Sequence, residues 1–445
     1  MPYARHSDAD RAHMLATIGV DSLEELFADI PEAVRAGGLD LPEPEAEQPR
    51  ATRLEWLAGR NRTDLMSFLG AGAYRHYIPV VVDEIIRRGE FLTAYTPYQP
   101  EVSQGTLQAI WEYQSLIAQL TGLDVVSASH YDGSTATAEA ALMAIRQTKR
   151  ERVLISRAVH PHFRKTTETY FSGRFILDEI PMTPAGSTDL EAMERMLADG
   201  NVAGVAVAQP NFFGALEDMA TAAELAHAAG ALFIAAVEPT SLAVLSSPAE
   251  YGADIAAGEG QPLGIPLQYG GPYLGILAAT EKLMRQIPGR LIGRTKDVDG
   301  KRAYVMTIRA REQDIRREKA ASNICTNQSL CALAATVYLS AIGPTGLHNV
   351  ATSGAEKARE LERALAEVGA PRTHSAPYLN EFAIRVPEAQ RVHETLIERG
   401  VLAGVPLANF YEEPELAESL LICATEVTTS EEIAGFASAL KEMLA

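Results

Sequence analysis

The chain has 445 residues, of which 47% are hydrophobic and 7% aromatic, which is enough apolar material for a large core in two or three domains. Its formal net charge of −19 argues against nucleic acid or an anionic membrane as a partner. No apolar run has the length of a membrane span, and the first residues lack the hydrophobic stretch of a signal peptide, so a cytoplasmic location is expected.

The three cysteines, Cys325, Cys331 and Cys423, form no C-x-x-C pair and lie in apolar surroundings. This usage is typical of buried thiols in a reducing compartment. No matching His or Cys cluster accompanies them, so no metal site is expected.

The amino-terminal region is expected to be helical. Ser7 precedes one helical run, and Ser22 with Glu25 forms a capping-box pattern ahead of a second. A segment rich in proline and glutamate, residues 41–49, is typical of a surface linker. We therefore predict a helical segment with its linker over residues 1–75.

Helices then alternate with short apolar runs. Pro79 is expected to begin a helix that ends at Gly89. Continuous apolar strands between helices imply a sheet that is parallel or mostly parallel and is covered on both faces. We therefore predict a large doubly wound α/β domain over residues 76–321. Its strand candidates are residues 125–127, 153–155, 202–208, 231–237, 254–257 and 273–278.

A smaller α/β domain is predicted over residues 322–445. It opens with a long helix from residue 329 to residue 342, and after a Gly/Pro turn a charged amphipathic helix is expected from residue 356 to residue 368. Two strand–helix units then complete the chain. Thr428 with Glu431 is the expected cap of the last helix.

A candidate phosphate site follows the first predicted strand. In the sequence YDGSTA, the hydroxyls of Ser134 and Thr135 and the backbone amides open a helix, whose positive end attracts a phosphate. The alternative is an ordinary helix cap, since serine and threonine are common at helix starts.

Two further candidates stand at strand ends. His160 ends the run VLISRAVHPHF, and Glu238 follows ALFIAAV. In a doubly wound sheet the carboxyl ends of the strands line the ligand crevice, so both side chains are expected beside the loop at Ser134. The alternatives are a structural histidine and a solvated loop acid.

A glycine-rich stretch, residues 258–264, follows the next strand and contains Gln261. Pyridoxal-phosphate (PLP) enzymes bind their cofactor as a Schiff base on a lysine amine. The chain has no lysine between Lys165 and Lys282. An amide therefore stands where such an enzyme would need an amine.

The stretch LTAYTPYQPEVSQG, residues 92–105, contains paired prolines that prevent a regular helix. Its side chains Tyr95, Tyr98, Gln99 and Gln104 form a polar and aromatic surface suited to reaching a partner's site. The alternative is an extended arm that packs on its own subunit.

Basic and acidic residues interleave over residues 309–319, ahead of the sequence SNICTNQ. Such mixed charge is usually a solvated helix followed by a cap. A contact with an anion or with another subunit is the alternative.

These stretches together resemble the amino-terminal half, or the separate first subunit, of glycine decarboxylase, the P-protein of the glycine cleavage system. The likeness spans essentially the whole chain, which is too short for the fused form and so resembles the two-subunit form. The motifs are FLTAYTPYQPEVSQG (residues 91–105), SASHYDGSTATAEA (127–140), GADIAAGEGQPLGIPLQYGGP (252–272) and IRREKAASNICTNQ (315–328).

That family implies an aspartate-aminotransferase-like PLP fold (fold type I), with a large mixed-sheet domain, a smaller carboxyl-terminal α/β domain and an amino-terminal helical extension. By this resemblance, Ser134 and Thr135 match the phosphate loop and His160 falls near the ring-stacking position. Glu238 stands where active members have aspartate, and Gln261 approximates the lysine position. The two departures imply that this cofactor site is a remnant.

The resemblance therefore implies a lysine-free subunit that pairs with a homologous PLP-bearing subunit in an α2β2 heterotetramer. With PLP on its partner, the enzyme would decarboxylate glycine and pass the methylamine moiety to the lipoyl group of H-protein. This chain would complete the site from across the interface. The arm residues expected to do so are Tyr95, Thr96, Tyr98, Gln99 and Gln104.

Two other hypotheses differ in class. A purely architectural subunit would stabilise the catalytic subunit and dock H-protein without touching substrate. A self-sufficient PLP decarboxylase would need an unexpected lysine such as Lys282, which follows a later strand and is poorly placed for the crevice.

Overall fold

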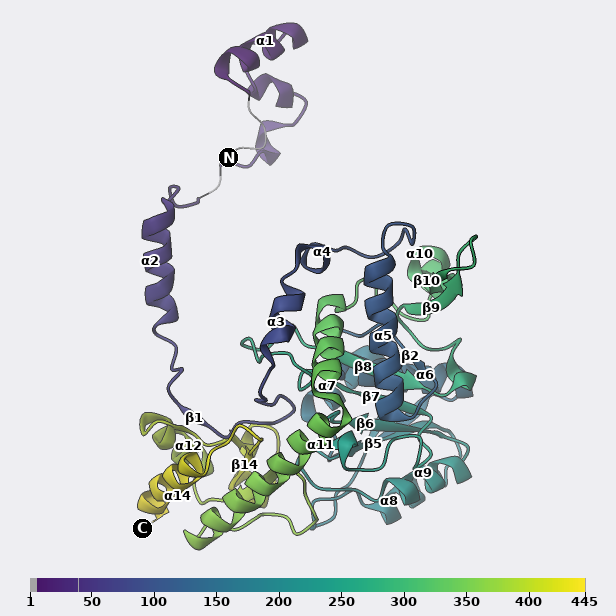
Figure 1. Cartoon of the computed structure of the whole chain (residues 1–445), viewed down its shortest axis with the longest axis vertical. Coiled ribbons are helices and arrows are strands. Elements are labelled where there is room, and N and C mark those ends of the chain that lie inside the picture. Colours follow the sequence, from purple (N-terminus) through teal and green to yellow (C-terminus); the bar gives the residue numbers. More distant parts are fainter. Residues whose placement is uncertain (1–5, 39, 445) are drawn as a thin grey trace. The chain divides into compact units, whose positions relative to one another are not determined.

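The computed structural model describes residues 6–38 and 40–444 (Figure 1). The chain divides into two compact units, Met1–Thr63 and Asp64–Ala445. The domain limits predicted at residues 75 and 321 stay predictions.

The described part of the first unit consists of short helices that bury none of their own side chains. Ser7 caps the first helix as predicted, because its hydroxyl accepts from the Asp10 amide and the Asp10 carboxylate accepts from the Ser7 amide. After Ser22 only a 3-10 turn forms, so the predicted second helix is wrong. The elements are α1 (Asp8–Ile18), η1 (Glu24–Phe27), η2 (Glu32–Val34) and α2 (Glu47–Ala58).

The second unit is built on a seven-stranded mixed sheet with the order β2-β8-β7-β6-β5-β3-β4. Neighbours from β4 to β7 pair in parallel, and β8 runs antiparallel to β7 and β2, which confirms a mostly parallel sheet. The strand β4 has two acidic residues among its five, and it carries no continuous apolar signal. The strands are β2 (Val125–Val126), β3 (Arg152–Ser156), β4 (Ile176–Ile180), β5 (Val202–Gln209), β6 (Leu232–Val237), β7 (Ile255–Glu259) and β8 (Gly275–Ala279).

Both faces of this sheet are buried, because successive apolar side chains point to opposite sides. On β3, Val153 and Ile155 join one core cluster and Leu154 joins the other. The helices α6 (Gly133–Thr148) and α7 (Pro161–Phe171) contribute to the first cluster, and α8 (Leu190–Leu197) and α9 (Met219–Ala228) contribute to the second.

A hairpin that the sequence did not predict packs beside α5 (Gln104–Thr121). Its strands β9 (Leu291–Lys296) and β10 (Arg302–Thr307) pair antiparallel. Short helices precede α5 and follow the hairpin. They are α3 (Val80–Ile86), α4 (Gly89–Leu92), η5 (Arg309–Arg311), α10 (Gln313–Arg316) and η6 (Arg317–Lys319).

The long helix α11 (Ser329–Glu367) breaks at Gly343, whose φ of 63° is a left-handed value that glycine adopts without strain. The break confirms the predicted turn, but the second half starts immediately after it and not near residue 356. By length and composition α11 could cross a membrane, yet half of its most apolar window is buried within the protein. Such burial is typical of a core helix.

The carboxyl-terminal part forms a three-stranded antiparallel sheet with the order β11-β14-β13. Thr429 and Glu432 cap its last helix, because the side chain of each accepts from the backbone amide of the other, so the predicted cap at Thr428 and Glu431 is wrong by one residue. The strand β1 (Met66–Ser67) reaches this region from the other end of the unit and pairs with β12 (Val401–Leu402). The remaining elements are β11 (Glu381–Arg385), α12 (Ala389–Glu398), β13 (Val405–Pro406), η7 (Leu407–Asn409), α13 (Pro414–Ala417), β14 (Ser419–Cys423) and α14 (Ser430–Leu444).

Candidate functional site

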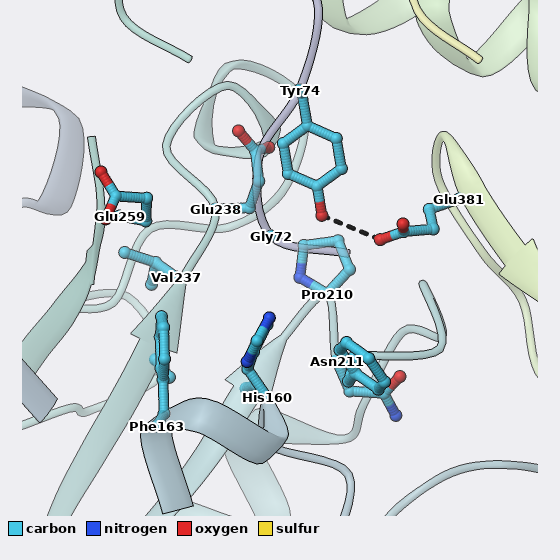
Figure 2. A pocket seen from close by; sticks show the side chains of 13 residues that line it. Gly72, Tyr74, His160, Phe163, Pro210, Asn211, Val237, Glu238, Glu259 and Glu381 are labelled. Carbon is cyan, nitrogen blue, oxygen red and sulfur yellow. Dashed lines mark hydrogen bonds between the residues drawn. The ribbon is translucent and has the colours of Figure 1, made fainter. Parts of the chain in front are cut away.

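Residues from several strand ends line one cavity, as the sequence predicts for a doubly wound sheet (Figure 2). His160 follows β3, Glu238 follows β6 and Glu259 ends β7. The free space is about 60 Å³, room for a few water molecules. Another segment of the same chain fills the rest of the space at these strand ends.

The filling segment comprises residues 68–77, which run from β1 towards α3 and which we call the strap. The Ala71 carbonyl accepts from Nε2 of His160 at 2.8 Å, and its amide donates to Oε1 of Glu381 at 2.5 Å. Gly72 follows with a φ of +91°, and a Cβ there would lie 2.8 Å from the His160 ring. Glycine is therefore required at this crossing.

Tyr74 fixes the strap from both its backbone and its side chain. Its hydroxyl donates to Oε2 of Glu381 at 2.8 Å (Figure 2), and its ring is buried. Gln261 holds the backbone: its Oε1 accepts from the Tyr74 amide at 2.8 Å and its Nε2 donates to the Tyr74 carbonyl at 3.0 Å. Nε2 also donates to the Ile265 carbonyl at 2.7 Å. The amide of Gln261 is thus fully used within the chain.

His160 caps α7 and is neutral. Its Nδ1 accepts from the His162 amide at 3.1 Å while its Nε2 donates to the strap, which fixes one tautomer. Burial lowers the pKa of His160 to about 4. Its ring stacks on Phe163 with 5.1 Å between ring centroids. The ring therefore serves helix capping and strap packing.

The amino terminus of α6 already holds an anion, the Glu259 carboxylate. Its Oε2 accepts from the Gly133 amide at 2.9 Å, and its Oε1 accepts from the amides of Gln261 and Leu274, each at 2.9 Å. Gly133 permits this approach, since a Cβ there would lie 2.8 Å from the Glu259 nitrogen. The positive helix end and three amides are satisfied by this one carboxylate.

The other predicted members of the phosphate loop also serve the protein itself. The cap of α6 is Asp132, whose Oδ1 accepts from the Thr135 amide at 2.7 Å, while the Thr135 hydroxyl oxygen accepts from the Asp132 amide. Ser134 is half-buried in the first turn. The Glu238 carboxylate accepts from the amides of Thr240 and Ser241 in its own loop.

Two buried carboxyl groups of this region titrate near neutrality. Burial raises the pKa of Glu259 to about 7, although three amide hydrogen bonds oppose the rise. Burial likewise raises the pKa of Glu381 to about 7, against the donors Ala71 and Tyr74. The strap is thus held by Glu381, a group whose charge depends on pH.

The arm, residues 92–105, borders a second cavity of about 210 Å³. Tyr95 and Thr96 line this cavity together with residues 326–329 at the start of α11. Two of the four sequence motifs therefore meet here. Tyr95 is 76% exposed, so its side chain is free for contacts outside this chain.

Two guanidinium groups pack against the Tyr98 ring, those of Arg290 and Arg309, at 5.5 Å and 5.6 Å from its centroid. Arg290 is 96% buried and donates to the Tyr98 hydroxyl at 3.3 Å and to Oδ1 of Asn327 at 3.2 Å. In the described residues no carboxylate forms an ion pair with it. The Tyr98 ring, by contrast, is 42% exposed.

The two arm glutamines differ in their surroundings. The Gln104 side chain clamps β10, since its Oε1 accepts from the Tyr304 amide at 2.8 Å and its Nε2 donates to the Tyr304 carbonyl at 2.9 Å. Gln99 makes no side-chain hydrogen bond within the described chain and is exposed. Their assignment to a partner's site stays a prediction, and for Gln104 the geometry favours a structural role.

Comparison with known proteins adds the family. The model of the glycine cleavage system P-protein matches residues 1–440. The chain belongs to this family. The resemblance drawn from the four motifs is therefore confirmed.

Curated P-protein relatives match along the whole chain. The probable glycine dehydrogenase (decarboxylating) subunit 1 of Moorella thermoacetica is 54% identical over all of both chains. The protein of the same description in Geobacillus kaustophilus is 48% identical over 98% of each chain. A crystal structure of glycine decarboxylase (P-protein) of the glycine cleavage system, in inhibitor-bound form, is 44% identical, covers 99% of this chain and 100% of its own, and has a TM-score of 0.90.

More distant solved structures show the fold alone. The apo cysteine desulfurase from Thermococcus onnurineus is 16% identical, covers 86% of this chain and 95% of its own, and has a TM-score of 0.64. Together with the P-protein structure, such neighbours confirm the predicted aspartate-aminotransferase-like architecture of PLP fold type I.

The residues of this P-protein chain do not fit PLP at the strand ends. Glu259 already binds the α6 amide that would meet the phosphate, and Gln261 has no amine to offer. The strap leaves about 60 Å³, whereas ligand pockets commonly measure about 300–1,000 Å³. Three carboxyl groups line the cavity, those of Glu238, Glu259 and Glu381. Negative charge there would repel a phosphate.

Sequence reasoning missed the groups that close this P-protein site. Glu259 follows the rule used for Glu238, an acid at a strand end, and that signal could have found it. Tyr74 and Glu381 are 307 positions apart, and no periodicity relates them. Arg290 gave no signal either, because its role depends on the packing of the hairpin against the arm.

Proposed function

We propose that this chain is the lysine-lacking subunit of a two-subunit glycine dehydrogenase (decarboxylating), active only with a homologous second subunit that carries PLP. The observation that carries the proposal is the closed strand-end cavity, in which Glu259 and the strap occupy the space for a cofactor. The relatives named as subunit 1 of that enzyme support it. A chain that cannot hold PLP needs a partner that does.

In this proposal PLP on the second subunit supplies the electron sink for the loss of carbon dioxide from glycine, and the lipoyl group of H-protein takes up the aminomethyl group. The present chain completes the site from across the interface. Its exposed Tyr95, Tyr98 and Gln99 offer hydroxyl and amide groups that can bind and orient substrate and exclude water.

Arg290 and Arg309 are positioning residues for the arm. They hold the Tyr98 ring from within the chain, so that the exposed edge of the ring is fixed before the partner arrives. Such preorganisation lowers the entropy lost when a site is assembled. Arg309 is ion-paired with Asp314 at 2.8 Å, whereas Arg290 has no carboxylate partner among the described residues, so its positive charge beside the arm suits the carboxylate of glycine.

An assembly of two copies of each chain follows from the same proposal. The fold type I body would pair with a homologous body, and an arm from one chain would serve the site of the other. Each second subunit then needs one copy of the present chain.

The test is reconstitution. Each purified subunit and their mixture are assayed for PLP absorbance and for glycine–bicarbonate exchange in the presence of H-protein. We expect neither property in this chain alone and both in the mixture, with sedimentation at the mass of a 2:2 complex. Exchange activity in this chain alone, or two non-interacting species in the mixture, would overturn the proposal.

A further inference from the structure

The basic charge of this chain is concentrated in one stretch. Residues 285–319 contain eleven Lys and Arg against five Asp and Glu, a net charge of +6. The other 410 residues contain 28 basic and 53 acidic side chains, a net charge of −25. This stretch comprises the β9–β10 hairpin and the segment through α10 and η6. A positive region on such an acidic protein requires a physical explanation.

Much of this charge is solvent-exposed and unpaired. The name basic surface is used here for six exposed side chains, Lys296, Lys301, Arg302, Arg316, Arg317 and Lys319. Only Lys301 has a carboxylate within ion-pair distance among the described residues, the 69% exposed Asp299 at 3.7 Å. A solvated helix with interleaved charges would instead pair most of its cations internally.

Two large apolar side chains stand among these charges. Val298 at the hairpin turn is fully exposed, and Ile315 in α10 is 53% exposed. Single exposed apolar residues are common on protein surfaces, but an apolar anchor inside a polar rim is also the usual arrangement of a protein–protein contact. Charge steers the encounter, and the apolar residues add contact area.

The basic surface adjoins the arm on both of its segments. Gln104 at the end of the arm bonds the backbone of Tyr304 in β10, and Arg309 between the hairpin and α10 lies over the Tyr98 ring. A protein bound to this surface would therefore lie next to the arm. Figure 1 shows β9, β10 and α10 at the same end of the second unit as the start of α5.

We propose that this basic surface docks an acidic protein, and that the docked protein is the lipoyl carrier that collects the aminomethyl group. The identity of the carrier rests on the proposed function, whereas the acidic character of the partner rests on the surface itself. The carrier must bring its lipoyl group to the site that the arm completes, and the surface lies beside that arm. The proposal requires an acidic face on the carrier.

The experiment uses the complex of both subunits and lipoylated H-protein. Two double variants are made. One carries Lys296→Glu and Lys301→Glu on the hairpin, and the other carries Arg316→Glu and Arg317→Glu in the α10–η6 segment. Arg195→Glu with Arg391→Glu is the matched control, since both side chains are exposed on other helices and the charge change is equal. The KM for H-protein, its Kd by direct titration and the KM for glycine are measured at several salt concentrations.

Each basic-surface variant should raise the KM and Kd for H-protein by about tenfold at low salt, with a weaker dependence on salt than wild type. The KM for glycine and the assembly should not change, and the control should behave as wild type. An unchanged Kd in both variants, or an equal rise in the control, would overturn the proposal.

Two other results would also overturn it. Loss of assembly in the variants would assign the surface to the second subunit, and tight binding of duplex DNA by wild type but not by the variants would assign it to nucleic acid. A wild-type complex that binds H-protein through this surface but lacks glycine exchange would contradict the proposed function and leave the docking surface standing as a site for an acidic protein.

Discussion

The Glu259 carboxylate accepts a hydrogen bond from the Gly133 amide at 2.9 Å, so a side chain of the protein occupies the anion position at the start of α6. The same carboxylate also accepts from the amides of Gln261 and Leu274. Glu259 thereby links three segments: the start of α6, the loop that contains Gln261, and the residue directly before β8. This internal anion accounts for a PLP fold that needs no phosphate to complete its helix terminus.

Replacing Glu259 with alanine should leave three buried amides without an acceptor and destabilise the protein by about 2–4 kcal/mol. Inorganic phosphate should then restore part of the lost stability by binding at the vacated helix terminus, which wild type cannot do. Urea unfolding with phosphate and with chloride of equal ionic strength measures both effects. Equal phosphate stabilisation of wild type and variant would contradict the assignment of Glu259.

The stability of the strap should fall as the pH rises through 7. In the folded chain the pKa of Glu381 is about 7, above its usual value of 4.5, so the folded state binds the proton more tightly than the unfolded state. Its contribution is full below about pH 4.5 and is lost as the pH passes 7. The shift corresponds to roughly 3 kcal/mol for this fully buried group.

Glu381→Gln isolates that effect, because glutamine mimics the protonated carboxyl at every pH. The free energy of unfolding, measured in urea between pH 5 and 8.5, should fall less steeply with pH in the variant than in wild type. Parallel pH profiles for the two proteins would show that Glu381 is not the titrating group.

Gln261→Lys alone should not create a PLP site. A lysine ammonium group has no lone pair to accept from the Tyr74 amide, so the variant loses the backbone clamp while the strap and Glu259 still fill the cavity. We expect a destabilisation of about 1–3 kcal/mol and no reducible PLP adduct. Borohydride reduction after incubation with PLP, followed by peptide mapping, is the measurement. A modified lysine at position 261 would mean that the strap opens readily.

The middle of the arm and its carboxyl-terminal end should respond differently to truncation of their side chains. In the complex, Tyr98→Ala or Gln99→Ala should lower glycine exchange by about a hundredfold with assembly and PLP content intact, because a positioned group is lost from the site. Tyr98→Phe keeps the ring packed against the guanidinium groups of Arg290 and Arg309 and removes only the hydroxyl. Normal exchange at full PLP occupancy would remove Tyr98 and Gln99 from the site and favour the architectural hypothesis.

Gln104→Ala is the contrasting change. Its side chain makes hydrogen bonds to the backbone of Tyr304 and Pro100, so its loss should mainly destabilise the contact between α5 and the hairpin by about 1–3 kcal/mol. Thermal unfolding of the chain and exchange in the complex are compared. A large loss of the exchange rate without a loss of stability would show that Gln104 contributes to the partner's site.

The sequence predicted the large sheet well, because β5 and β6 are continuous apolar runs that alternate with the helices α8 and α9, which is the pattern of a parallel sheet covered on both faces. It placed His160, Glu238 and Gln261 near one crevice for the same reason, since parallel strands end at a common edge. The residue that caps a helix could not be predicted where two neighbours can both do so, as Thr428 and Thr429 can at the last helix.

The closure of the site could not be predicted in this way. The strap has no helical or strand periodicity, and its partners Glu381 and Gln261 lie in other parts of the chain. The sequence did not predict the hairpin, because charged residues and a glycine interrupt the alternation of apolar and polar residues in its strands. In the structure β9 and β10 nevertheless pair along their whole length. Contacts between distant segments decide both features.

The measurement that tests the central claim most directly is the location of the PLP-lysine bond in the assembled enzyme. The complex of both subunits is reduced with borohydride, and the modified peptides are assigned to one chain or the other. The account predicts that every reduced PLP-lysine lies on the second subunit, and that this chain yields none, alone or in the complex. A PLP-lysine peptide from this chain, for example at Lys282, would contradict the account.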